Sequence, residues 1–256
     1  MPWTFAHPAA ILPLRRLCPR WLSLPALILG AMAPDMSYYI GMHAKWRAFC
    51  HTPEGVVLAC LPVCLLMLAL LLRFARPVTV LLPEPHRTLV LDQLHAPPRP
   101  AWAGGFVLVL SVLLGAATHL LWDTFTHDGS WGAALLPELD EPLWIALDRP
   151  FHLTHLLQHL STAAGAAALA FTYRSALRDR PRPTQRMHDP QRARVLLACV
   201  GVAIIVGAAS AHALTPTTLP AYSSHLLVRT VVWSTSCFTT LFVIASAVWW
   251  RWHGDV

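Results

Sequence analysis

A chain of 256 residues in which 55% are hydrophobic and only 12% are charged does not have the composition of a soluble globular protein. Its mean hydropathy of +0.50 is typical of proteins that cross a membrane several times. The net charge of +6 is concentrated in arginine-rich loops, so we interpret it as a topology signal rather than as a nucleic-acid footprint. The sequence contains no glycine-rich phosphate loop, nucleotide fingerprint or Ser-His-Asp order.

Six apolar runs predict an all-α, polytopic membrane helix bundle that forms one integral domain over residues 1–256. Each run reaches or approaches the roughly 20 residues that a spanning helix needs. The first, residues 21–41, contains Pro25, Pro34 and Asp35, and forms either a full span or a re-entrant pair of half-helices. The other runs are residues 55–72, 104–122, 155–173, 195–214 and 226–250.

Arginine is distributed unequally among the connecting loops. Residues 174–194 carry seven Arg and two acids, residues 73–103 carry four Arg and two acids, and residues 128–154 carry five acids and one Arg. Positive charge marks the cytoplasmic side of a membrane protein. We therefore expect the loops 73–103 and 174–194 and both termini to be cytoplasmic, and the acidic loop 128–154 to be external.

Polar residues lie near the end of the first apolar run and just before the second, on the side expected to face outside. Asp35 follows Pro34, and His51 immediately precedes the second run, where Glu54 is placed to orient it. A carboxylate beside backbone freed by proline is tolerated at membrane depth only around a buried or wet pocket. The alternative is that Asp35 caps a helix and His51 is a surface residue.

The third run ends in the clearest functional signal. His119, Asp123 and His127 are spaced i, i+4 and i+8, so they share one stripe of a helix. A carboxylate in a hydrocarbon-facing segment costs about 2.5–3.5 kcal/mol, and therefore turns inward to a partner. With histidine on both sides, this spacing predicts a metal site. The alternative is a polar contact in which Asp123 bonds a neighbouring helix.

The fourth run opens with a second pair of imidazoles, His155 and His159, again at i and i+4. We read His152, just before them, as a loop or capping residue, with a metal ligand as the alternative. Two helices that each present a pair of ligands can build a metal site within a bundle. Histidine with carboxylate ligands favours zinc, with manganese or iron as alternatives.

The chain carries a series of motifs in order: the N-terminal segment with His7, Gly30-Ala-Met-Ala-Pro-Asp35, His51-Thr-Pro-Glu-Gly55, His119-Leu-Leu-Trp-Asp123-Thr-Phe-Thr-His127 and Leu157-Gln158-His159. In their order and spacing they resemble the bacterial membrane proteins grouped as domain of unknown function family 4184, from residue 1 to about residue 250. The resemblance implies a place in the bacterial inner membrane.

The same series is distantly similar to the inner-membrane metal-dependent hydrolases and to the zinc-dependent phospholipase C superfamily. That similarity adds His7 to the expected ligands and implies one or two divalent ions. The gap from Asp123 to His127 is shorter than in those enzymes, and the last pair is His-x-x-x-His where they have His-x-x-x-Glu. The full set of expected ligands is His7, Asp35, His51, His119, Asp123, His127, His155 and His159.

The predicted function is a membrane-embedded metal-dependent hydrolase acting on a phosphoester or lipid-linked substrate at the outer face. Asp35 and Asp123 are the expected catalytic carboxylates: Asp123 bridges metals, and Asp35 is a ligand or the base that orients a water molecule. Three alternatives stay open, namely metal binding or transport without hydrolysis, haem binding, and a structural role.

Overall fold

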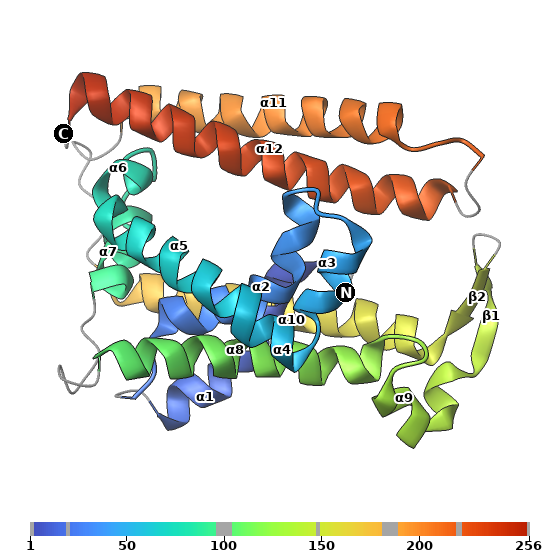
Figure 1. Ribbon diagram of the computed structural model, residues 1–256. Coiled ribbons are helices and arrows are strands. Elements are labelled where there is room, and N and C mark those ends of the chain that lie inside the picture. The colour runs from blue at the N-terminus through green and yellow to red at the C-terminus, as the bar shows by residue number, and fades with distance from the viewer. Residues whose placement is uncertain are drawn as a thin grey trace. The chain divides into compact units, whose positions relative to one another are not determined.

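The computed structural model describes residues 3–18, 21–95, 104–146, 149–180, 189–218 and 222–254. Parts of both loops expected in the cytoplasm, residues 96–103 and 181–188, lie outside this range. The all-α, polytopic bundle is confirmed (Figure 1). Within these described residues, four helical segments are long and apolar enough to cross a membrane, namely Pro53–Arg73, Gly104–Thr126, Pro190–Leu214 and His225–His253.

The two other expected spans are also helical but differ from these four. Helix α2, Leu24–Tyr39, has 16 residues with Pro34 inside it, so it is shorter than a full span. Helix α10, Leu153–Arg178, has 26 residues, and polar side chains such as His155 and His159 occupy its first turns. Length and hydropathy therefore distinguish these two helices from the four apolar ones.

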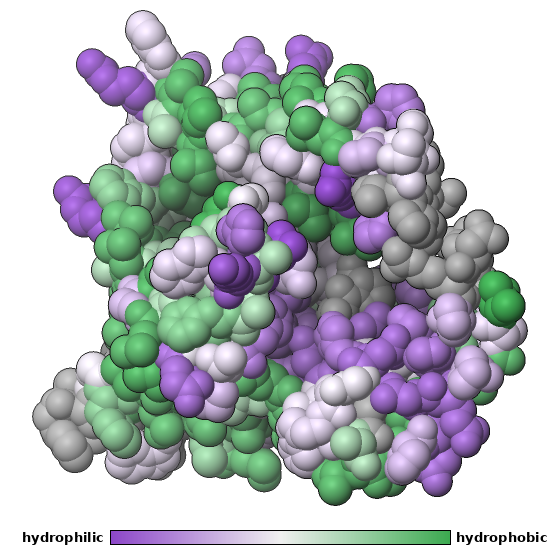
Figure 2. Space-filling model, turned by 45° about the vertical axis from the view of Figure 1, so that its right-hand side comes forward, coloured by the Kyte–Doolittle hydropathy of each residue, from purple (hydrophilic) through white to green (hydrophobic). Residues whose placement is uncertain are grey.

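Apolar side chains on the candidate spans are exposed to an unusual degree. Leu58 is 69% exposed, Phe106 66% and Ile205 70%. Hydrophobic surface of this extent marks contact with another apolar phase rather than with water. Figure 2 shows hydrophobic residues exposed over much of one face and hydrophilic residues gathered at its lower right. Together with the four apolar helices, this surface indicates a membrane protein.

The chain divides into two compact units. Unit 1 comprises residues 1–68 and 97–172, and unit 2 comprises residues 69–96 and 173–256. Unit 1 contains η1 (Thr4–Ile11), α1 (Leu12–Leu17), α2, α3 (Ala44–Cys50), α4 (Pro53–Gly55), the π-helical turn η2 (Val56–Cys60), most of α5 (Leu61–Arg73), α8 (Gly104–Thr126), α9 (Trp131–Leu135), η4 (Pro137–Asp140), two strands and most of α10.

Helices α2 and α8 form the centre of unit 1 because two glycines let their backbones touch. A Cβ atom on Gly30 would lie 2.2 Å from the Val112 carbonyl oxygen, and one on Gly115 would lie 2.3 Å from that of Leu27. Ser111 Oγ also accepts the backbone N–H of Ser23 at 2.9 Å. Small residues permit such close packing between membrane helices. The approach brings Asp35 on α2 beside His119 on α8.

The acidic loop contains a β-hairpin that the sequence pattern did not predict. Strands β1 (Pro142–Ala146) and β2 (Arg149–His152) pair antiparallel, with Ile145 opposite Pro150 and a register shift between Pro142 and Trp144. The hairpin runs directly into α10. Because His152 ends β2, its position is set by strand pairing as well as by the start of the helix.

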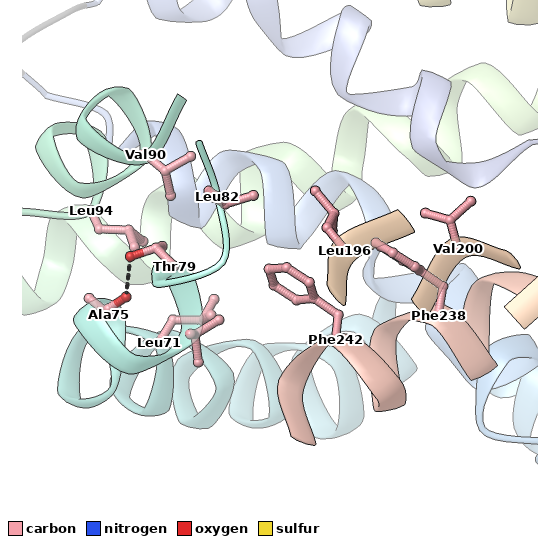
Figure 3. A pocket seen from close by; sticks show the side chains of 11 residues that line it. Leu71, Ala75, Thr79, Leu82, Val90, Leu94, Leu196, Val200, Phe238 and Phe242 are labelled. Atoms are coloured by element: carbon pink, nitrogen blue, oxygen red, sulfur yellow. Dashed lines mark hydrogen bonds between the residues drawn. The ribbon is translucent and has the colours of Figure 1, made fainter. Parts of the chain in front are cut away.

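Unit 2 consists of the end of α5, α6 (Ala75–Thr79), α7 (His86–His95), the end of α10, and the long helices α11 (Pro190–Leu214) and α12 (Tyr222–His253). An apolar cavity of 510 Å³ in this unit is lined by residues that include Leu71, Leu196 and Phe242. Figure 3 shows these side chains around it. The hydroxyl of Thr79 on its wall donates to the Ala75 carbonyl at 2.7 Å, so the lining exposes no unsatisfied hydroxyl.

Candidate metal centre

Five side chains from four segments of unit 1 converge beside the contact of α2 and α8. The helical turn η1 carries His7, α2 carries Asp35, and His51 follows the last residue of α3. Helix α8 supplies both His119 and Asp123. Four of the five are buried, and the His51 side chain is 26% exposed. We call His7, Asp35, His51, His119 and Asp123 the inner cluster.

The distances within the inner cluster match those between ligands of one metal ion. His119 Nε2 lies 3.3 Å from Asp123 Oδ2 and 3.8 Å from Asp35 Oδ1. His51 Nε2 lies 3.2 Å from Asp35 Oδ1 and 3.8 Å from Asp123 Oδ2. His7 Nε2 lies 3.7 Å from Asp123 Oδ1 and 4.0 Å from Asp35 Oδ2. Tetrahedral ligands at about 2.0–2.2 Å from zinc are about 3.4 Å apart, so most of these separations suit an ion at the centre.

Backbone carbonyls orient two of the three imidazoles. His119 Nδ1 donates to the Ala31 carbonyl at 2.8 Å, and His51 Nδ1 donates to the Arg47 carbonyl at 2.8 Å. A carbonyl only accepts, so each neutral ring carries its proton on Nδ1 and turns the lone pair of Nε2 toward the carboxylates. Metal-binding histidines are held in this way. The acceptor for His51 is thus Arg47 rather than Glu54, which is exposed.

His7 is held as a neutral ring. It stacks on His119 with ring centroids 3.7 Å apart and planes inclined by 17°. Burial, followed by the neighbouring His119, lowers the pKa of His7 to about 3. Neither His7 Nδ1 nor Nε2 has a hydrogen-bond partner, and His119 Nε2 and Asp123 Oδ1 are likewise buried without one. Such orphaned polar atoms are costly unless a ligand satisfies them.

The charge of the inner cluster also favours a divalent ion. Two buried carboxylates face three imidazoles, and Asp35 is further held by Thr4, whose hydroxyl donates to Oδ2 at 2.7 Å. Burial lowers the pKa of His51, but hydrogen bonds to Asp35 and to the Arg47 carbonyl outweigh it, so this pKa lies above its ordinary value. A proton on His51 compensates one carboxylate only. A divalent cation compensates both and uses the orphaned atoms, so the residues present fit a metal ion.

His127 lies at the margin of this group. It follows the last residue of α8, and its Nδ1 lies 3.7 Å from Asp123 Oδ1. The same nitrogen donates to the backbone carbonyl of Asp123 at 3.2 Å, and the side chain is 44% exposed. Of the three residues at i, i+4 and i+8, two therefore lie buried in the inner cluster, and the third lies at its edge.

The structure places His155 and His159 in different surroundings. His155 Nε2 lies 3.4 Å from Asp128 Oδ2, and His152 Nδ1 lies 3.3 Å from the same oxygen. His159 is exposed and stacks on Phe151, with ring centroids 6.1 Å apart. We call Asp128, His152 and His155 the hairpin cluster. It too has the composition of a metal-binding group, and its side chains are more exposed than those of the inner cluster.

Sequence reasoning missed three contributors, namely Thr4, Arg47 and Asp128. Asp128 follows His127 directly in the chain, which is the one signal that pointed to it. His152 was read as a loop or capping residue, with a metal ligand as the alternative. Nothing in the sequence pattern marked Thr4 or Arg47, because the first acts through a hydroxyl 31 positions from Asp35 and the second through its backbone carbonyl.

Among the described residues, a polar pocket and an apolar groove border the inner cluster. A polar pocket of 470 Å³ is lined by Arg47, His51, Asp123 and His127, among others. An apolar groove of 320 Å³ between η1, α8 and α10 reaches His7; its walls also contain Trp122 and Ser161, and its small residues are Ala6, Ala9, Ala10, Ala164, Gly165 and Ala168. The polar pocket therefore borders the inner cluster at His51 and Asp123, and the apolar groove borders it at His7.

Comparison with known proteins identifies the family but adds no activity. No curated protein and no solved structure gave a match. The model of one family, described as a domain of unknown function (DUF4184), matches residues 1–247. That range contains every residue of the inner cluster and of the hairpin cluster. The chain belongs to the DUF4184 family.

Proposed function

We propose that the protein is a membrane-embedded, metal-dependent hydrolase whose metal ligands come from the inner cluster. One observation carries the proposal: three Nε2 atoms face two buried carboxylates at ligand-to-ligand distances, and backbone carbonyls orient two of the three imidazoles. Zinc fits this set of histidine and aspartate ligands best.

The two carboxylates have distinguishable roles in this proposal. Asp123 directs Oδ1 toward His7 and Oδ2 toward His119 and His51, so it can bind one ion or bridge two. Asp35 directs Oδ1 toward His51 and His119, while Thr4 holds Oδ2. Asp35 is therefore a ligand or a proton acceptor of fixed orientation. A bound divalent ion supplies hydroxide near neutral pH by lowering the pKa of a coordinated water to about 7.

An amphiphilic phosphoester is the substrate class that we propose. The groove at His7 is apolar and lined by small side chains, which suits part of a lipid chain. The pocket at His51 and Asp123 is polar, which suits a headgroup. Both belong to unit 1 beside the end of an apolar helix, where a lipid-linked substrate can reach them from the bilayer.

Elemental analysis combined with an activity assay tests the proposal. The protein is purified in mild detergent, its metal content is measured, and hydrolysis of bis-(p-nitrophenyl) phosphate and of a short-chain phospholipid is followed. Asp123→Asn should lose both metal and activity. Glu54→Gln is the matched control, because it makes the same chemical change at an exposed carboxylate three positions from His51. A wild-type protein without bound metal would contradict the proposal.

Metal binding or transport without hydrolysis is separated from this proposal by the same measurements. It requires stoichiometric metal with no turnover of either substrate. The apolar lining of the groove at His7 argues against an ion path on that side, because a moving cation needs polar ligands along its way.

The position of the site in the membrane is also a proposal. By the arginine distribution, the C-terminal end of α8 and the loop 128–154 face outward, in a cell membrane whose inner side carries both termini. Single cysteines introduced at positions 130–140, in a background without native cysteine, should react with a membrane-impermeant maleimide in intact cells. Labelling of position 178 instead would invert the topology and place the site in the cytoplasm.

A further inference from the structure

The polar pocket beside the inner cluster contains a cation that the metal site itself does not require. Arg47 lines this pocket together with His51 and Asp123. Within the described part of the chain, no carboxylate forms a salt bridge with Arg47. A half-buried guanidinium that lines the same pocket as the buried Asp123, and forms no salt bridge with it, is available to bind an anion.

Two contacts hold the guanidinium in place. Its Nη1 donates to the Met42 carbonyl at 3.2 Å, and its Cζ lies 4.9 Å from the centroid of the Tyr38 ring, which lines the same pocket. Guanidinium groups stack on aromatic faces and present their N–H groups in a planar fork. One of five N–H groups is used by Met42, so the fork retains donors for a ligand.

The charges around the pocket select the sign of that ligand. Asp35 and Asp123 together carry two negative charges, which one divalent ion neutralises. With both carboxylates neutralised, the charge of Arg47 makes this pocket net positive. Asp123 is the only carboxylate among the described residues that line the pocket. An anion with several oxygens, such as a phosphate group, can contact both the Arg47 guanidinium and a metal ion held by the inner cluster.

We propose that Arg47 binds the phosphate group of the substrate at the opening of the inner cluster, so that the pocket accepts a phosphoester and discriminates against a neutral ester. This inference rests on the proposed function for its metal ion, but the anion site is measured by binding and not by turnover. Arg47 also carries the carbonyl that orients His51. Substitution of its side chain leaves that backbone contact in place.

The test is calorimetric titration of the purified, metal-containing protein in detergent. Inorganic phosphate is the ligand in one arm and dihexanoyl phosphatidic acid in the other. The variants are Arg47→Gln, Arg47→Lys, and the control Lys45→Gln, which removes a positive charge two positions away on an exposed residue. Metal content of each variant is measured first, since an unchanged value shows that the site has formed.

We expect Arg47→Gln to weaken phosphate binding about tenfold or more, Arg47→Lys to have an intermediate effect, and Lys45→Gln to have little. Tighter binding of the lipid than of free phosphate by the wild type identifies a lipid headgroup as the natural source of the anion. Equal binding identifies a water-soluble phosphate. Phosphate binding that depends on Arg47 without any hydrolysis supports this inference and contradicts the hydrolase proposal. Wild-type protein that binds no phosphate, or Arg47→Gln that binds it equally, overturns the inference.

Discussion

Two groups of histidine and aspartate lie in unit 1, and they differ in how their imidazoles are hydrogen-bonded. In the inner cluster, Nδ1 of His119 donates to the Ala31 carbonyl, so the lone pair of Nε2 faces the carboxylates. In the hairpin cluster, the backbone N–H of His152 donates to Nδ1 of His155 at 3.0 Å. A neutral His155 therefore carries its proton on Nε2, and directs an N–H toward Asp128.

The carboxylates of the two clusters differ in exposure and in hydrogen bonding. Asp128 accepts a hydrogen bond from the Thr154 hydroxyl, and its side chain is 40% exposed. Asp123 is 11% exposed at its side chain, and its Oδ1 has no hydrogen-bond partner. The difference teaches that residue types and spacing alone do not define a metal site. Burial and the hydrogen bond made by Nδ1 of each imidazole distinguish the two clusters. They indicate that the inner cluster needs a cation, whereas the hairpin cluster links the hairpin to the ends of α8 and α10.

Removal of one imidazole from each cluster gives the largest contrast. His119→Ala should lower metal affinity about 100-fold or more, because even partners that only orient a ligand contribute about 10–100-fold. His155→Ala should change it less than about threefold, since the ring does not offer a lone pair at Nε2. Competition with a fluorescent chelator measures both affinities. Equal losses in the two variants would show that one metal centre includes both clusters.

Separation of α2 from α8 should disrupt the inner cluster without changing any ligand. Gly115→Ala introduces a Cβ atom 2.3 Å from the Leu27 carbonyl oxygen, and overpacking of this kind costs about 1–3 kcal/mol. Thermal unfolding in detergent should shift downward and metal content should fall. Gly105→Ala on the same helix is the control, because its Cβ would meet nothing within 4 Å. Its stability should stay equal or rise by up to about 1 kcal/mol. A stable, metal-loaded Gly115→Ala protein would refute the close contact.

Loss of the hydroxyl that orients Asp35 should have a smaller effect on the same cluster. Thr4→Val keeps the shape of the side chain and removes the hydrogen bond to Asp35 Oδ2. We expect metal affinity to decrease about tenfold, as for other outer partners of metal ligands. Thr239→Val is the matched control, because that hydroxyl donates to the Thr235 carbonyl within its own helix. An affinity unchanged by Thr4→Val would remove η1 from the positioning of Asp35.

The hairpin cluster should respond to the loss of a hydroxyl through local stability rather than through metal. Thr154→Val removes the donor to Asp128 Oδ1, and a typical intramolecular hydrogen bond contributes about 1 kcal/mol. Amide hydrogen exchange in β1 and β2 should therefore become faster, while metal content stays at the wild-type value. A parallel loss of metal in this variant would assign the hairpin cluster to the metal centre.

Much of the fold could be predicted from the sequence because bilayer spans depend on local properties. Length and hydropathy of a run are sufficient to locate α8, α11 and α12, since each helix satisfies its own backbone hydrogen bonds. The hairpin in the acidic loop could not be located in this way, because strand pairing between residues 142–146 and 149–152 is a relation between segments. The predicted position of the loops on either side of the membrane stays a prediction.

The sequence by itself determined only some of the residues that carry the candidate chemistry. The helical spacing of His119 and Asp123 is a property of one helix and places both on one stripe whatever surrounds it. Only the tertiary structure decided which of the other residues join them. Contact of α2 and α8 at Gly30 and Gly115 brings Asp35 to His119, and packing of η1 against both helices inserts His7. The carbonyls of Ala31 and Arg47 accept from Nδ1 of His119 and His51, whereas the His152 backbone N–H donates to Nδ1 of His155. These bonds decide which imidazoles offer a lone pair at Nε2, because a neutral ring carries its proton on one nitrogen and binds a metal through the other.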